Sequence, residues 1–311
     1  NGGWDLIIID EAHRVAGSTG EVARHRMASL LSKASPYILL LTATPHSGKT
    51  EPFLRLMRLL DQEAFPDYRA IVKDQVAPYI IRTEKREAVD NEGGRLFKDR
   101  ITKAVHIKWQ QRHSLQRELY RLVSRYVAHG YNRAVKEKKY YIGFLMVLMQ
   151  RLVSSSTAAI WDSIERRISI LENQQAEVLA ITSEDMYETD AQALLDALLS
   201  AAALDLKCEL NELNNILSVA KQAQFQYTDA KAEYLVDLLD KLKSEEDRRQ
   251  AIIFTEFVAT QEFLKGSLQR RGFSCSVLNG SMDIDERNAA INEFRTKTDI
   301  LISTDAGGEG I

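Results

Sequence analysis

The sequence has few cysteines and no apolar run long enough to span a membrane. Its two cysteines, Cys208 and Cys275, stand far apart without paired spacing, so we expect reduced thiols rather than a disulfide framework. The longest apolar candidate, residues 142–149, is interrupted by Gly143 and falls short of the roughly 20 residues that a spanning helix needs. No signal-peptide pattern opens the sequence. These absences predict a cytoplasmic protein with no membrane partner.

Histidine is also sparse, and its distribution does not favour a zinc site. The six histidines follow no metal-ligand spacing. What remains is an ordinary composition: 311 residues, of which 45% are hydrophobic and 27% charged. Such numbers are typical of a soluble globular protein of roughly two domains.

The net charge of −3 conceals two regions of opposite sign. Residues 82–140 hold 16 Lys and Arg against 7 Asp and Glu, whereas residues 172–213 hold 10 acids and a single base, Lys207. A local basic excess is what neutralisation of nucleic-acid phosphates requires, so we interpret the first region as a candidate nucleic-acid contact. The acidic region is more simply explained as the solvated face of helices.

Hydrophobic periodicity divides the chain into three sections. The first alternates strands (4–10 and 37–43) with helices (20–33 and 51–60), which predicts a parallel sheet with covering helices. The middle section is helical, with 3.6-residue apolar stripes in 114–135, 141–154, 158–171, 191–223 and 230–243, and a polar, irregular connection over 172–190. The last section alternates again, with strands at 251–255, 274–278 and 299–303 and helices at 259–271 and 284–295.

The segment LIIIDEAH, from Leu6 to His13, is the most informative part of the chain. Its short, β-branched apolar run predicts a strand buried on both faces. Asp10 and Glu11 then follow at the carboxyl end of that strand, where open α/β sheets bind ligands. A second signal, LLLTATP, ends at Pro45 about one strand–helix–strand unit later. The structural alternative is an ordinary buried strand whose terminal Asp caps a helix.

Together these two segments resemble motifs II and III of superfamily two helicases and translocases, and the TATP form resembles the SWI/SNF-type branch. The resemblance implies an α/β fold made of parts of two RecA-like parallel-sheet lobes separated by a large all-helical insertion. The corresponding domains are residues 1–108 for the first lobe, 109–247 for the helical insertion and 248–311 for the second lobe. The region around residues 95–170 is similar to the helical region of bacterial members, including those linked to phage defence.

The resemblance also implies roles for residues of the first lobe. Asp10 would hold Mg²⁺ through coordinated water, and Glu11 would orient and deprotonate the water that attacks ATP. His13 would report the nucleotide state to the other lobe, with Thr42 and Thr44 as hydroxyl partners that couple the motifs. The segment PYIIRTEKREAV resembles the arginine-containing strand that closes the first lobe, which places Arg82 among the coupling residues.

In the last section, the segments IIFTEF and LNGSMDIDERNAAINEF and the glycine-rich STDAGGEGI resemble the motifs of a second lobe. Gly280 and Ser281 would contact the DNA backbone, and Arg287 would be a structural or interlobe residue. Ser303 and Thr304 would end a strand and take part in DNA binding. The following loop would approach the cofactor through Asp305, Gly308 and Gly310, while Gly307 adds to its freedom.

The segment ATPHSGKT, from Ala43 to Thr50, satisfies a permissive phosphate-loop pattern, but we reject it as the phosphate cradle. It follows the acidic strand instead of preceding it, and Pro45 removes one of the amides that such a loop uses. We therefore expect an internal fragment of a longer protein that supplies the phosphate loop and an arginine-bearing motif. By itself, the fragment is expected to be inactive.

For the intact protein, the resemblance implies an ATP- and Mg²⁺-dependent translocase on double-stranded DNA, with RNA polymerase or phage-defence proteins as partners. Two alternatives stay open. One is a DEAH-type helicase that separates strands, although TATP, GGEG and the large helical insertion argue against it. The other is a non-catalytic DNA-binding scaffold, which the intact Asp10 and Glu11 argue against.

Overall fold

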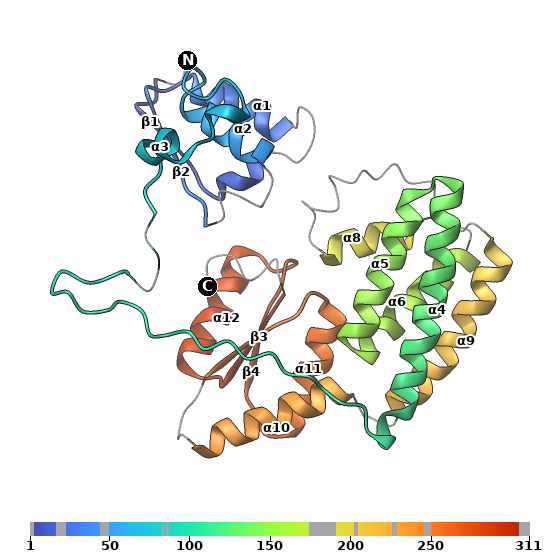
Figure 1. Cartoon of the computed structure of the whole chain (residues 1–311). Coiled ribbons are helices and arrows are strands. Elements are labelled where there is room, and N and C mark those ends of the chain that lie inside the picture. Colours follow the sequence, from blue (N-terminus) through green and yellow to red (C-terminus); the bar gives the residue numbers. More distant parts are fainter. Residues whose placement is uncertain are drawn as a thin grey trace. The chain divides into compact units, whose positions relative to one another are not determined.

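The computed structural model describes residues 3–16, 23–43, 50–82, 84, 87–173, 191–201, 205–225, 229–245 and 250–304. The chain forms two compact units, residues 1–104 (unit 1) and residues 105–311 (unit 2). Figure 1 shows a small α/β body in unit 1 and, in unit 2, a helical bundle beside a second sheet. Each unit is described by itself.

Unit 1 is built on two parallel strands, β1 (Leu6–Ile9) and β2 (Tyr37–Leu40), with Leu6 opposite Tyr37. The short 3₁₀ helix η1 (Ala12–Val15) follows β1, and it packs with helices α1 (Ala23–Ser32) and α2 (Thr50–Leu60). Their small core holds the buried residues Ala12, Val15, Ala16, Ala28, Leu56 and Leu59. The predicted strand–helix alternation of this section is confirmed.

The prediction that the first strand is buried on both faces is wrong. Exposure alternates along β1, where Leu6 and Ile8 are 50% and 56% exposed, and Tyr37 and Leu39 of β2 are exposed on the same face. The reason is that η1, α1 and α2 pack against the face that carries Ile9 and Leu40. Within the described residues of unit 1, no element covers the opposite face.

The remainder of unit 1 is a second small core and an extended segment. Helix α2 packs its Phe53, Leu54 and Met57 against the fully buried Phe65, close to η2 (Tyr68–Ala70), α3 (Lys73–Val76) and η3 (Ala77–Tyr79). Asp61 ties this region together, because its carboxylate accepts hydrogen bonds from the Ala64 amide at 2.8 Å and the Tyr79 hydroxyl at 2.7 Å. Both bonds stabilise the charged form and lower the pKa of Asp61.

Unit 2 begins with a bundle of long helices. After η4 (Gln111–His113) come α4 (Ser114–Glu137), α5 (Tyr140–Ser155), α6 (Thr157–Glu172), α8 (Ala191–Leu199) and α9 (Leu206–Phe225). Helix α4 packs against α5 and α9, and α6 packs against α9 (Figure 1). One continuous apolar core joins them, as the helical stripes of the sequence predict. The predicted connection over 172–190 lies mostly outside the described residues.

The single helix predicted over residues 191–223 is wrong, because α8 ends in a turn at Ser200 and a second helix, α9, follows further along the chain. Helix α8 ends at Leu199, and the Asp205 carboxylate accepts the Cys208 amide at 3.0 Å where α9 begins. The fully buried Arg167 of α6 donates to the carbonyls of Leu199, at 2.8 Å, and Ala201. A charged donor from another helix thus satisfies carbonyls that a continuous helix would have bonded internally.

Arg167 belongs to a buried polar cluster that extends from this turn. Its Nε donates to Glu209 at 2.9 Å, and the Tyr126 hydroxyl donates to the same carboxylate at 3.0 Å. Burial raises the pKa of Tyr126 well above its ordinary value, and the negative charge of Glu209 adds to this effect. The cluster therefore holds α4, α6 and α9 together by a charged pair within the bundle.

The second sheet contains three parallel strands in the order β3-β5-β4, formed by Ala251–Phe254, Ile300–Ser303 and Cys275–Leu278 respectively. All four residues of the central strand β5 are buried. Ile300 and Ile302 face α10 (Ala230–Glu245) and α11 (Val258–Arg270), while Leu301 packs in a separate core with Ala290 of α12 (Ile284–Thr296). The predicted alternation of the last section is confirmed.

The bundle and this sheet pack into one unit. Phe257, at the start of α11, is 1% exposed and belongs to the core of the bundle. The Thr260 hydroxyl lies 2.8 Å from the hydroxyls of both Ser155 and Ser156. The predicted division of these residues at 247/248 therefore falls inside a packed unit, and it stays a prediction. The predicted fold class is confirmed: it is α/β, with one parallel sheet before and one after a helical section of the sequence.

Within the described residues, no helix combines the length and the apolar character needed to cross a bilayer. Both cysteines are free thiols, as predicted; Cys208 is exposed and Cys275 is half-buried. Burial, followed by the nearby charge of Asp299, raises the pKa of Cys275 to about 11.

Candidate functional site

The carboxyl ends of β1 and β2 meet at one edge of the unit 1 sheet. The Leu41 amide donates to the Ile9 carbonyl and the Ala12 amide donates to the Leu41 carbonyl, both at 2.9 Å. These bonds extend the parallel pairing just beyond the strands, so the residues after β1 and those after β2 lie side by side. Asp10 and Glu11 therefore stand at the edge where the sequence predicts a ligand site.

Glu11 adopts a left-handed backbone conformation, with φ 47° and ψ 45°. This conformation costs a non-glycine residue about 1 to 2 kcal/mol. It allows the chain to turn from β1 directly into η1 while the next residue, Ala12, is fully buried beneath the turn. A strained residue at a strand end is a frequent property of functional sites.

His13 joins the two strand ends through its Nδ1 atom. That nitrogen lies 3.1 Å from the Thr42 hydroxyl and 3.2 Å from Glu11 Oε2. One imidazole nitrogen therefore contacts both the carboxylate that follows β1 and the hydroxyl that follows β2. The structure thus brings together three of the residues predicted from the two segments, although all three keep partial exposure.

Asp10 is exposed, and its Oδ1 accepts the Glu11 amide at 2.8 Å. Two adjacent carboxylates are the hard oxygen donors that suit Mg²⁺ held through water. Within the described residues, no group of three or more His, Cys, Asp or Glu side chains converges as a complete metal cage. Two carboxylates alone would leave most coordination positions of Mg²⁺ to water.

Of the other two predicted coupling residues, the structure describes only Arg82. Arg82 is 78% exposed at its side chain and pairs with Glu84 at 3.8 Å. No contact between Arg82 and the acidic pair occurs within the described residues. Thr44 lies outside the described residues, as does most of the ATPHSGKT segment.

In unit 2, Gly280 and Ser281 form an exposed loop directly after β4. Arg287, on the first turns of α12, donates to the carbonyls of Met282 at 3.1 Å and Gly280 at 3.4 Å. Arg287 thus supports the loop from within unit 2. By contrast, Ser303 and Thr304 are buried, at 0% and 2% exposure, at the end of β5.

A buried chain of amides, which sequence reasoning missed, connects this loop to β5. The side-chain oxygen Oδ1 of Asn279 accepts both the hydroxyl, at 2.7 Å, and the amide of Ser281. Asn279 then donates to Gln261 at 3.0 Å, and Gln261 donates to the carbonyls of Leu278 and Ile302 at 3.0 Å and 2.7 Å. Gln261 is fully buried, so the exposed loop is fixed to the centre of the sheet. The predicted residues Asp305, Gly307, Gly308 and Gly310 lie outside the described residues.

A second missed network surrounds Asp229, which is 3% exposed at the start of α10. Its Oδ1 accepts the Lys231 and Ala232 amides, both at 3.1 Å. Its Oδ2 accepts Gln116 Nε2 of α4 at 2.8 Å and the Thr157 amide of α6 at 3.2 Å. One carboxylate therefore receives four donors from three helices.

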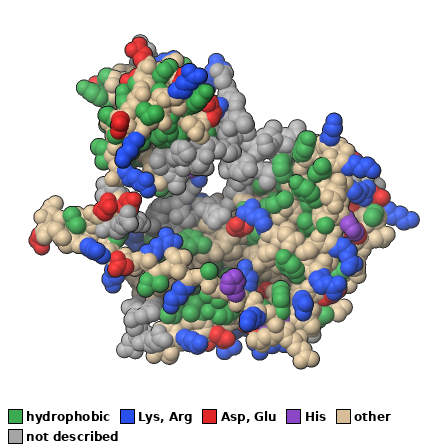
Figure 2. All heavy atoms as spheres, in the orientation of Figure 1, with side chains coloured by type: hydrophobic (Ala, Val, Ile, Leu, Met, Phe, Trp, Pro, Cys, Tyr) green, Lys and Arg blue, Asp and Glu red, His purple; other side chains and the backbone are tan. Residues whose placement is uncertain are grey.

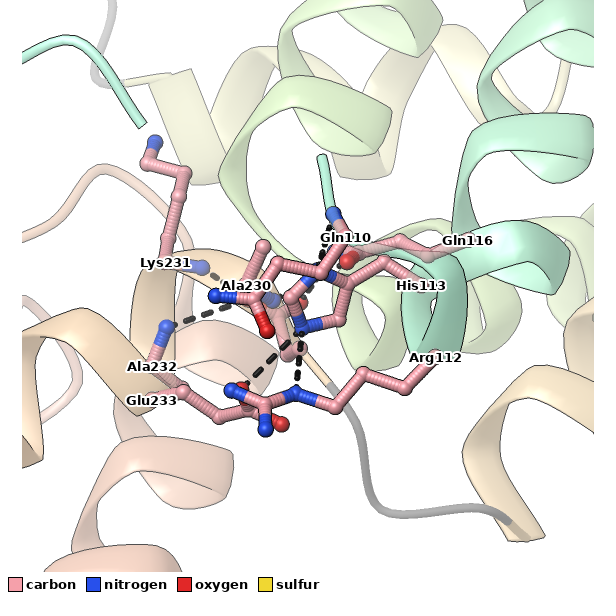
Figure 3. Close-up of polar contacts among 9 residues, drawn as sticks. Gln110, Arg112, His113, Gln116, Ala230, Lys231, Ala232 and Glu233 are labelled. Atoms are coloured by element: carbon pink, nitrogen blue, oxygen red, sulfur yellow. Dashed lines mark hydrogen bonds and ion pairs between the residues drawn. The ribbon is translucent and has the colours of Figure 1, made fainter. Parts of the chain in front are cut away.

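The same region carries a charged contact between η4 and α10, which Figure 3 shows in close-up. His113 Nδ1 accepts the Gln110 amide at 3.1 Å, and His113 Nε2 lies 3.1 Å from Glu233 Oε2 and 3.5 Å from Arg112 Nε. Arg112 pairs with the same carboxylate at 2.7 Å. We call Asp229, Gln116, His113, Arg112 and Glu233 the α4–α10 network.

Two family models match consecutive parts of the chain. A model described as the SNF2-related domain matches residues 1–190, and one described as the helicase conserved C-terminal domain matches residues 230–311. The first match covers more than half of the chain and includes the Asp10–Glu11 edge. This chain belongs to the SNF2-related family and carries the domains of a helicase-type, ATP-dependent protein.

Curated relatives align along nearly the whole chain. An uncharacterised ATP-dependent helicase of Bacillus subtilis, YqhH, is 26% identical over 99% of this chain and 48% of its own length. The RNA polymerase-associated protein RapA of Photobacterium profundum is 24% identical over 99% of this chain and 31% of its own length. The chain thus spans about half or less of the curated relatives it matches.

Two solved structures are similar at lower levels. The helicase domain of Pyrococcus furiosus Hef is 14% identical, with a TM-score of 0.46, over 97% of this chain and 62% of that chain. The Sulfolobus solfataricus SWI2/SNF2 ATPase core in complex with double-stranded DNA is 15% identical, with a TM-score of 0.30, over 96% and 53% respectively. The fold class itself rests on the parallel strand pairing described above.

Proposed function

We propose that the whole protein is an SWI/SNF-type translocase that couples ATP hydrolysis to movement along double-stranded DNA. The observation that carries the proposal is the contact of His13 with both Glu11 and Thr42, which links the acidic strand end to the neighbouring strand end. In a family of ATP-dependent proteins, this is the place where a change at the nucleotide would be passed to the rest of the fold.

In this proposal, the two carboxylates have separate tasks. Asp10 would hold Mg²⁺ through coordinated water, and the bound metal would supply charge stabilisation to the phosphates. Glu11 would orient the attacking water and accept its proton, and its side chain is 47% exposed at the end of β1. Proton transfer and positioning of this kind each contribute several kcal/mol to hydrolysis, so neither carboxylate is replaceable by its amide.

His13 and Thr42 would couple the site to movement. If Glu11 changes its hydrogen bonding as ATP is consumed, the shared contact on His13 Nδ1 changes with it. Thr44 and Arg82 remain proposed coupling residues on the strength of the family resemblance alone. Asp305, Gly308 and Gly310 remain proposed cofactor-binding residues on the same ground.

The DNA contact of the last section is proposed at Gly280 and Ser281. The loop is exposed, it offers polar groups, and the Asn279–Gln261 chain fixes it to β5. Ser303 and Thr304 would support this contact from the buried end of β5. Contacts to phosphate rather than to bases would allow movement on any sequence.

Residues 1–311 contain no phosphate-binding loop that we accept, and we propose that the whole protein supplies one outside this range. The chain by itself would then hydrolyse ATP poorly. From the name of the RapA relative, we propose RNA polymerase as a partner in the cytoplasm or nucleoid, with phage-defence proteins as the alternative partner.

The test compares Asp10→Asn and Glu11→Gln in the whole protein with Glu51→Gln, an exposed carboxylate of unit 1 that pairs with Arg55. We expect DNA-stimulated ATP hydrolysis to fall at least about a hundredfold in the first two variants and to stay unchanged in the third. Displacement of a third strand from duplex DNA should fall in parallel.

The outcomes separate the alternatives. Efficient separation of a blunt duplex by the wild-type protein would replace the translocase proposal with a strand-separating helicase. DNA binding without any ATP hydrolysis would replace it with a non-catalytic scaffold.

A further inference from the structure

Helix α4 carries a basic stripe on the face that points away from the bundle. Arg117, Arg121, Arg125 and Lys136 are all exposed, whereas the opposite face buries Leu119 and Val123 in the core. At 100° per residue, the four cations fall within about 100° of the helix circumference, and the three arginines follow at about 6 Å along the axis. Figure 2 shows Lys and Arg side chains over the side of unit 2 that carries α4.

The stripe keeps most of its positive charge. Within the described residues, Arg117, Arg125 and Lys136 have no carboxylate within ion-pair distance, and only Arg121 pairs, with Glu118 at 2.9 Å. Helices of the same bundle behave differently. Arg166 of α6 pairs with Asp196 at 2.7 Å, and Lys221 of α9 pairs with Glu165 at 3.1 Å.

The other exposed side chains of α4 favour nucleic acid over a protein partner. Tyr120 and Tyr131 are 38% and 47% exposed, and a tyrosine hydroxyl is one of the groups that bond phosphate oxygens. Protein interfaces need a desolvated apolar centre. Val135 is the only large aliphatic side chain exposed on α4, all of whose residues the structure describes.

The α4–α10 network attaches this stripe to the second sheet. Gln116 lies one residue from Arg117, and it bonds Asp229 at 2.8 Å and the Ala230 amide at 3.0 Å at the start of α10. Helix α10 in turn packs on α11 and β5. The stripe and the Gly280–Ser281 loop therefore belong to one packed unit.

We propose that the α4 stripe contacts the phosphate backbone of duplex DNA and moves with the second sheet as one body. The inference rests on the proposed function and adds a second surface to it, outside the strand-end loops. Phosphate contacts by Arg and Lys are independent of sequence and release bound counterions, so they have a measurable salt dependence.

The test uses the whole protein and two matched double variants. Arg117→Ala/Arg125→Ala removes two exposed cations from the stripe, and Arg166→Ala/Lys221→Ala removes two exposed cations that pair with carboxylates. Affinity for a labelled duplex is measured from roughly 50 to 200 mM salt. We expect the stripe variant to bind more weakly on every sequence, with the slope of log affinity against log salt reduced by about 1.8, while the control keeps the wild-type slope.

Each outcome has a separate meaning. A wild-type slope in the stripe variant, with normal DNA binding by the wild-type protein, overturns the stripe inference and leaves the proposed function intact. Failure of the wild-type protein to bind duplex DNA overturns both. Unchanged DNA binding together with lost co-sedimentation with RNA polymerase assigns the stripe to an acidic protein surface and also overturns the inference.

Discussion

The carboxylates of Asp10 and Glu11 and the carboxylate of Asp229 represent opposite uses of the same chemical group. Within the described residues, the exposed Asp10 carboxylate accepts one amide, and the partly exposed Glu11 carboxylate contacts His13. Asp229 is buried and accepts four donors. The first pair keeps lone pairs available for a ligand, whereas the second group uses all of its capacity to join helices. The comparison teaches that a carboxylate indicates a ligand site when some of its oxygen lone pairs have no donor from the protein. Its negative charge alone does not distinguish the two cases.

The largest loss of stability should follow removal of the buried charge of Arg167, which pairs with Glu209. Arg167→Ala leaves Glu209, which is 13% exposed, without its cation and leaves the Leu199 and Ala201 carbonyls without their donor. Breaking a buried pair in this way costs about 3 kcal/mol of unfolding free energy. The measurement is urea denaturation followed by circular dichroism.

The adjacent residue provides the control for this prediction. Arg166 pairs with Asp196 on the surface, with side chains 40% and 47% exposed, so Arg166→Ala should change the unfolding free energy by less than about 1 kcal/mol. Equal losses in the two variants would remove the distinction between enclosed and exposed pairs.

A smaller loss of stability should follow from Asp229→Asn, which replaces one carboxylate oxygen by an amide nitrogen. In Asp229→Asn, one side-chain oxygen becomes an amide that faces donors it cannot accept, either at Gln116 and Thr157 or at the α10 amides. We expect a cost of about 2 kcal/mol, because buried donors lose their acceptor. Thermal unfolding of the two variants Asp229→Asn and Asp283→Asn gives the comparison.

Asp283 is the matched residue because it also starts a helix, α12, but at an exposed position where, within the described residues, its side chain accepts the Glu286 amide. Asparagine is as good a residue as aspartate at such a position. Asp283→Asn should therefore leave the melting temperature nearly unchanged, and a shift as large as that of Asp229→Asn would contradict the proposed role of burial.

The smallest effect on stability is expected at Glu11. Glu11→Gln should stay within about 0.5 kcal/mol of wild type, as surface substitutions do. Glu11→Gly should gain about 0.5 kcal/mol, because relief of the left-handed strain exceeds the added flexibility of the unfolded chain. Both variants should nevertheless lose ATP hydrolysis in the whole protein. A destabilisation above 1 kcal/mol in Glu11→Gln would assign Glu11 a structural role instead.

Lys138→Gly controls for strain. Lys138, at the end of α4, is the other described non-glycine residue with positive φ, at 57°. Its replacement by glycine should give a similar gain in stability without loss of hydrolysis. If Lys138→Gly also lost ATP hydrolysis, the loss in Glu11→Gly could not be assigned to removal of the Glu11 side chain.

The sequence was sufficient for most elements because their apolar runs and stripes are local. Helix α4 was predicted over 114–135 and forms over Ser114–Glu137, and β5 was predicted over 299–303 and forms over Ile300–Ser303. Local pattern failed where tertiary contacts decide. Arg167 stabilises the turn after α8 from a distant helix, and only the packing of α1 and α2 determines which face of β1 is covered.

The acidic edge could be predicted because its residues are contiguous, but the supporting amides could not. Gln261 and Asn279 belong to no recognisable segment. One signal was present: Gln261 stands on the stripe of α11 that carries Phe257, Leu264 and Leu268, all buried. A polar residue at a core position must find a partner, so its place alone indicates a buried hydrogen-bond chain. No pattern in sequence reveals that its partners are Asn279 and the Ile302 carbonyl.

The insertion of Phe257 into the bundle core constrains how the protein can be recombined with its relatives. A chimera joined between α10 and β3 would remove an aromatic ring from one parent's helices and present an unmatched ring to the other's. The Phe257 ring of the transplanted segment would then pack against bundle helices whose core is shaped for a different side chain. Chimeras that fold should exchange residues 105–311 as one block, because the second sheet and the helical bundle share a core.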